Sequence, residues 1–80
     1  MIDTTAFEEA VYQYKLDCVT LELCRSVMMN DISNRSARKN FESALQDVSR
    51  SAVRMNKQEA AIVEAAIASA CLRLNIPTPE

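Results

Sequence analysis

The fold of this chain is decided by residues 34–55, which read NRSARKNFESALQDVSRSAVRM. Apolar residues recur there every three or four positions, at Ala37, Phe41, Ala44, Leu45, Val48, Ala52 and Met55. That spacing collects them on one face of an α-helix and leaves the polar residues on the other. The helix is expected to start at Ser33 or Asn34 and to run to about Met55. The stretch therefore predicts one amphipathic helix over residues 34–55.

The preceding segment predicts a second helix, over residues 5–29. Thr5 and Glu8 have the spacing of a capping box at its start. Two apolar stripes run along it, one containing Phe7, Val11, Tyr14, Cys18 and Leu21, the other Tyr12, Leu16, Val19, Leu23 and Val27. Residues 18–23 also alternate as a strand would, but no other run offers a pairing partner, so we reject a β-strand. Residues 30–34 predict a short connection.

The following segment predicts a third helix, over residues 57–75. Asn56 and Glu59 have the form of another capping box, and Ile76-Pro77 ends the helix. We interpret Asn56 as a break between two helices, with a kink in one long helix as the alternative. The expected fold is an all-α, antiparallel three-helix arrangement in one domain, residues 1–80, which self-associates and has a frayed tail at residues 76–80.

The composition argues against catalysis and metal binding. The chain contains no glycine and no histidine, which excludes glycine-rich phosphate loops and removes the usual general base and zinc ligand. Cys18 and Cys24 are six residues apart, about 240° around a helix, and are badly placed to share a metal ion. Cys71 sits among alanines and predicts a small core residue. We therefore expect no catalytic residues, no cofactor and no metal.

The second apolar stripe of the first helix predicts a partner surface. The first and third predicted helices are both apolar on more than one side, and one further helix cannot cover them completely; exposed apolar patches commonly mark binding sites. The predicted partner-binding residues are Tyr12, Leu16, Val19, Leu23 and Val27. A homodimer that buries this stripe is the simplest arrangement. A strip of small residues in the third predicted helix would let another helix approach closely; it contains Ala61, Ala65, Ala68 and Leu72. The alternative is that these alanines are simply exposed, because alanine is an ordinary residue on helix surfaces.

Positive charge is concentrated in the middle of the chain, although the net charge is only −2. The bases concerned are Arg35, Arg38, Lys39, Arg50, Arg54 and Lys57. They have three interpretations: a solvated face partly neutralised by acids such as Asp17, a charged rim that contacts an acidic protein, or a surface for nucleic-acid phosphates. No aromatic residue stands among them to stack on a base, which disfavours single-strand binding.

These features together predict a small non-enzymatic protein-interaction module, such as an adaptor, a chaperone or an inhibitor of a larger complex. A dimeric nucleic-acid-binding regulator is the alternative. The first residues show no signal peptide, and the three cysteines are typical of free thiols in a reducing compartment. The longest uncharged apolar stretch, residues 65–72, is too short to span a bilayer. We therefore expect a cytoplasmic protein with no membrane contact.

Overall fold

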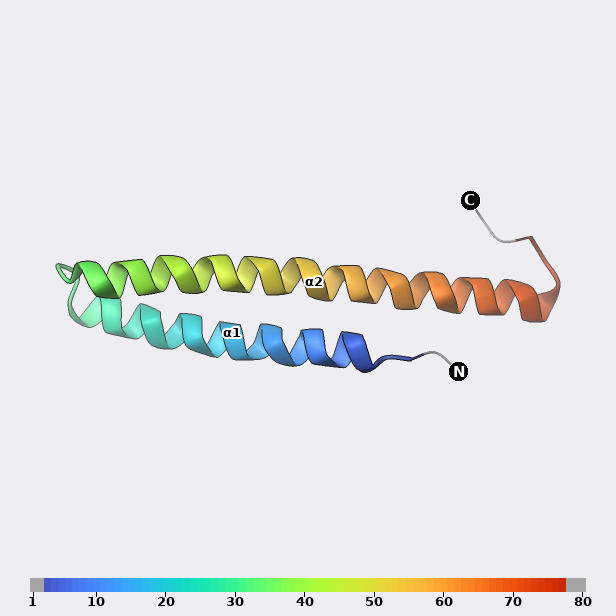
Figure 1. Cartoon of the computed structure of the whole chain (residues 1–80), viewed down its shortest axis with the longest axis horizontal. Helices are drawn as coiled ribbons and strands as arrows, with labels where there is room; N and C mark the ends of the chain where they lie inside the picture. Colours follow the sequence, from blue (N-terminus) through green and yellow to red (C-terminus); the bar gives the residue numbers. More distant parts are fainter. Residues whose placement is uncertain (1–2, 78–80) are drawn as a thin grey trace.

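Two long antiparallel helices make up the fold (Figure 1). The computed structural model describes residues 3–77, which contain α1 (Thr5–Asn30) and α2 (Arg35–Leu74) and no strand. The molecule is a rod with extents of 63 × 22 × 12 Å. The all-α prediction is confirmed. The three-helix prediction is wrong, because residues 35–74 form one uninterrupted helix and the fold is a helical hairpin.

The predicted break at Asn56 does not exist because the packing face of α2 continues through it. Met55, Gln58 and Ile62 are all half-buried and follow one another at helical spacing. An asparagine inside a helix costs only a few tenths of a kcal/mol relative to most residues, which such packing easily offsets. The capping-box pattern at Asn56 and Glu59 is therefore coincidental.

The start of α1 also differs in detail from the prediction. Asp3 accepts a hydrogen bond from the backbone N–H of Thr5, at 2.9 Å, and this bond lowers the pKa of Asp3. The hydroxyl of Thr4 donates to the carboxylate of Glu8 at 3.3 Å. The helix thus begins where expected, but Thr5 does not form the capping box with Glu8.

The connection between the helices is stabilised by local hydrogen bonds. The Ser33 hydroxyl donates to the side chain of Asp31, and the backbone N–H of Asn34 donates to the Asp31 carbonyl, both at 3.1 Å. Asn34 then caps α2, because its side chain accepts a hydrogen bond from the Ala37 N–H at 3.2 Å. The helix itself begins at Arg35, one residue after the later of the two predicted starts, Ser33 and Asn34.

Helix α2 ends in a Schellman motif at Asn75, which adopts the left-handed conformation with φ 58°. The Ile76 N–H donates to the Cys71 carbonyl and the Asn75 N–H to the Leu72 carbonyl. Cys71 is buried beside this cap, as predicted. Of the predicted frayed tail, residues 78–80 lie outside the described part of the chain.

Small side chains line the seam between the helices. The most buried residues there are Ala10 on α1 and Ala37, Ala44 and Ser51 on α2, and among residues 3–77 no large side chain is fully buried. The α2 residues of this set recur every seven positions, which keeps them on one side of the helix. Because they are small, the two helices approach closely, and the larger residues lie half-buried along the edges of the seam.

The hairpin is asymmetric because α2 is longer than α1. Ser51 donates a hydrogen bond to Asp17 across the seam, which fixes the register of the two helices. Thr5 is twelve residues before Asp17 on α1. Because the helices are antiparallel, Thr5 therefore lies opposite the part of α2 about twelve residues after Ser51, near residues 60–63. Residues 63–69 are all exposed. About three turns of α2, from residue 64 onward, thus extend past the start of α1 (Figure 1).

Candidate interaction surfaces

The two apolar stripes of α1 lie on opposite sides of the helix. The first stripe, with Phe7, Tyr14 and Leu21, is half-buried against α2. The second faces solvent: Tyr12, Leu16, Val19, Leu23 and Val27 are all exposed, between 42% and 65% of their area. The geometry follows from the helix itself, since Leu23 comes nine residues after Tyr14, or about 180° around the axis. We call these five exposed residues the outer face of α1.

The hairpin architecture explains why the outer face is uncovered. α2 is the one element that packs on α1 in the described residues, and it contacts α1 from one side. The expected third helix does not exist as a separate element that folds back across α1. The part of the chain assigned to it lies in line with the rest of α2 instead.

Charged residues flank the outer face of α1. Glu22 and Arg25 form a two-pronged ion pair in which the closest N–O distance is 2.5 Å. The hydrogen bond from Arg25 lowers the pKa of Glu22, and the Glu22 carboxylate raises the pKa of Arg25. Lys15 lies two turns before Glu22 on the same flank, because a seven-residue separation returns a helix to nearly the same direction.

The end of α2 that projects past α1 forms a second exposed apolar surface. Ile67, Leu72 and Leu74 are exposed, and Leu72 keeps 84% of its area in solvent, the largest fraction among the exposed large apolar side chains. We call residues 63–74 the C-terminal extension. The sequence pattern identified Leu72 within a strip of small residues but not Ile67 or Leu74, since their exposure depends on the helix being continuous and unpaired.

The six predicted rim residues do not form a single patch. Arg35, Arg38 and Lys39 lie in the first turns of α2, beside the connection. Arg50 is 15 residues after Arg35 on the same helix, a separation of about 22 Å along its axis. The structure therefore divides the predicted rim into two clusters.

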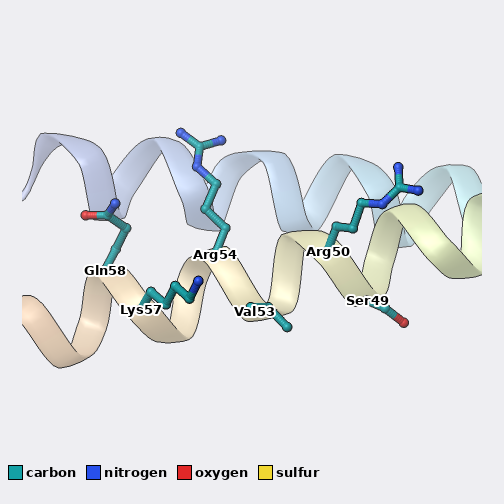
Figure 2. Close-up of a pocket in the computed structure, with 6 residues that line it drawn as sticks. All are labelled: Ser49, Arg50, Val53, Arg54, Lys57 and Gln58. Carbon is teal, nitrogen blue, oxygen red and sulfur yellow. The ribbon is translucent and has the colours of Figure 1, made fainter.

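Arg50, Arg54 and Lys57 form the second basic cluster. This cluster borders a shallow depression of about 480 Å³ (Figure 2). Arg50, Arg54, Lys57 and Val53 line it, and Val53 supplies an apolar wall that the sequence analysis did not single out. The side chains of Arg50 and Arg54 extend to the same side of α2 in Figure 2.

Acidic groups offset part of this positive charge. Asp47 lies 3.7 Å from Arg50 as an exposed ion pair. Arg54 also borders a neighbouring depression that is lined by Glu8 and Glu9 at the start of α1. Asp17, which the sequence analysis counted among the neutralising surface acids, instead faces the seam and binds Ser51.

The remaining reactive groups are dispersed. Cys18 and Cys24 are half-buried free thiols, and Cys18 raises the pKa of the nearby Tyr14 phenol. Among residues 3–77, no group of three cysteine or acidic side chains is arranged to hold a metal ion.

Neither α1 nor α2, over the residues described, contains a segment of the length and apolarity needed to cross a membrane.

Comparisons of the chain with models of known protein families, with curated proteins and with solved structures gave no match.

Proposed function

We propose that this protein is a non-catalytic protein-binding module that acts through two apolar helix surfaces, the outer face of α1 and the C-terminal extension of α2. The observation that carries the proposal is the imbalance between apolar content and burial. Nearly half of the residues are apolar, yet the most buried apolar residues are three alanines and one cysteine. Domains of this size are marginally stable even when they bury a normal core. A partner that covers these surfaces supplies the missing burial.

Helix-face docking is the mode of binding that the outer face of α1 supports best. Leu16, Val19 and Leu23 are exposed apolar anchors at its centre, and Lys15 and Glu22 provide a charged border. Apolar anchors supply most of the binding free energy in such interfaces, whereas rim charges set orientation and association rate.

The basic cluster supports a nucleic-acid-binding role less well. Phosphate binding depends on uncompensated positive charge. Here Asp47 pairs with Arg50, and Glu8 and Glu9 share a depression with Arg54. Nucleic-acid binding is therefore the alternative function, and its detection would replace the proposal of protein binding.

Affinity capture from cells that express the protein tests the function with matched variants. Val19→Asp disrupts the outer face of α1 and Ile67→Asp the C-terminal extension. Leu45→Asp is the control, because Leu45 lies on α2 outside both surfaces and is as exposed as Ile67, at 43% and 42%. We expect a bound protein that is lost with one of the first two changes and kept with the control.

The opposite result is also well defined. Retention of nucleic acid that weakens steeply with salt, and that Arg50→Glu with Arg54→Glu abolishes, would establish the nucleic-acid-binding alternative. Capture that none of the three aspartate variants alters would reject both apolar surfaces.

A further inference from the structure

The outer face of α1 has the residue pattern of one helix in an antiparallel two-helix coiled coil. Tyr12, Leu16, Val19 and Leu23 are separated by four, three and four residues, the alternation that keeps apolar side chains on one seam. We propose that the occupant of this face is a second copy of the same chain, with the two α1 helices antiparallel about a two-fold axis. This inference rests on the proposed function, because it assigns a partner to a surface named there.

One register pairs all four apolar residues. With the two-fold axis at the level between Asp17 and Cys18, Tyr12 lies opposite Leu23 of the second copy. Leu16 likewise lies opposite Val19 of the second copy, and the axis repeats both pairs. Each of these side chains exposes at least 42% of its area in the single chain, so the pairing removes large apolar groups from water.

The charges on the flank of α1 select the same register. Residues on this flank face the same flank of an antiparallel partner. In the register above, Lys15 lies beside Glu22 of the second copy, and the axis generates this pair twice. A shift of the register by seven residues in one direction would place Lys15 beside Lys15 of the second copy. The same shift in the other direction would place Glu22 beside Glu22 of the second copy. Both shifts place like charges together, which disfavours them.

The other flank of the outer face is uncharged at its centre. It contains Ala6, Gln13 and Thr20, with Val27 at the border of the outer face, and its one charged neighbour is Glu9, which points in the direction of Val27 and lies opposite Ser26 of the second copy at the end of the interface. In the same register Gln13 lies beside Thr20 of the second copy, and Val27 beside Ala6 of the second copy, so polar and apolar groups match. A parallel pair would set Lys15 and Glu22 against these uncharged residues and would gain no ion pair. The antiparallel arrangement is therefore the one that uses the charges.

The hairpin itself leaves this interface free. α2 packs on the opposite side of α1. A dimer formed in this way leaves the C-terminal extension of each chain uncovered. We accordingly assign the outer face of α1 to self-association and the C-terminal extension to a different protein.

Complementary charge variants provide the test. In a Lys15→Glu homodimer both flank pairs become Glu against Glu, and in a Glu22→Lys homodimer they become Lys against Lys. A mixture of the two variants restores opposite charges in both pairs, as does the double variant K15E/E22K. Lys39→Glu on α2 is the control, since it makes the same charge change outside the interface.

Sedimentation equilibrium of the full chain measures the outcome. We expect the wild type and K39E to dimerise, and K15E and E22K alone to dimerise about tenfold more weakly, a change within the range of exposed charge pairs taken together. The mixture and the double variant should regain most of the wild-type affinity. A monomeric wild type, or a mixture no tighter than its components, would overturn the proposal. A monomer that still captures a protein through Ile67 would leave the proposed function standing.

Discussion

Ser51 on α2 donates a hydrogen bond to Asp17 on α1, and this is the one side-chain hydrogen bond between the two helices in the described residues. Asp17 also accepts a hydrogen bond from Gln13 at 3.0 Å, one turn earlier on its own helix. Ser51 is 8% exposed, within a seam of otherwise apolar small residues. A single polar pair in an apolar seam fixes register, because any sliding of the helices leaves a carboxylate against alanine or methionine.

Replacing Ser51 should therefore weaken the hairpin. Ser51→Ala removes a hydrogen bond to a charged acceptor, and we expect the free energy of unfolding to fall by about 1.5–3 kcal/mol. Ser43→Ala is the matched control, because Ser43 is exposed on the same helix and alanine there is a better helix former. Urea denaturation followed by circular dichroism, at one protein concentration, measures both variants. Equal stability of the two would show that the Asp17 bond contributes nothing.

The sequence predicted the helical class, the extent of α1 and the start of α2 to within about one residue, because these depend on local spacing and capping chemistry. It did not predict that α2 is continuous, because asparagine is common at helix starts and is also tolerated inside helices. Whether Asn56 starts a new helix or lies inside a continuous one is decided by the packing of α2 on α1. Asp17 was assigned to the surface by its charge. Its spacing from Tyr14 and Leu21 was the available signal that it faces the seam.

The two asparagines provide a direct contrast. Asn34→Ala removes the side chain that caps α2 and should lower the free energy of unfolding by about 1 kcal/mol. Asn56→Ala should raise it by about 0.5 kcal/mol, because Asn56 lies inside the helix, where alanine is preferred. The same urea titration measures both. A loss of stability with Asn56→Ala would indicate that the helix is interrupted at this residue.

The close approach of the helices predicts intolerance to larger residues in the seam. Ala44 is 3% exposed, and Ala44→Leu should lower the free energy of unfolding by about 1–3 kcal/mol through overpacking. Ala61→Leu is the control on the exposed side of the same helix and should be nearly neutral. Thermal unfolding at fixed concentration compares them. If Ala44→Leu were as stable as Ala61→Leu, the seam would be wider than two alanine-faced helices allow.

The ion pair between Glu22, on the flank of the outer face, and Arg25 predicts how self-association depends on pH. Arg25 lowers the pKa of Glu22, so the Glu22 carboxylate stays ionised below the usual range for glutamate. A group with a lowered pKa contributes its stabilisation above its ordinary pKa and loses it as pH falls through the lowered value. The proposed Lys15 contacts should thus persist through mildly acidic pH and weaken only at a pH below the usual pKa range of glutamate.

Glu22→Gln separates this effect from the titration of the other acids. The glutamine variant keeps every other carboxylate, so its self-association should be weaker than that of the wild type at neutral pH and should change less between pH 6 and about pH 3. Sedimentation equilibrium across this range gives the two curves. If they ran parallel, the acid sensitivity would arise from net charge on the whole chain, and Glu22 would have no specific role. If they converged at low pH, the loss would be assigned to the carboxylate of Glu22, on the flank of the outer face.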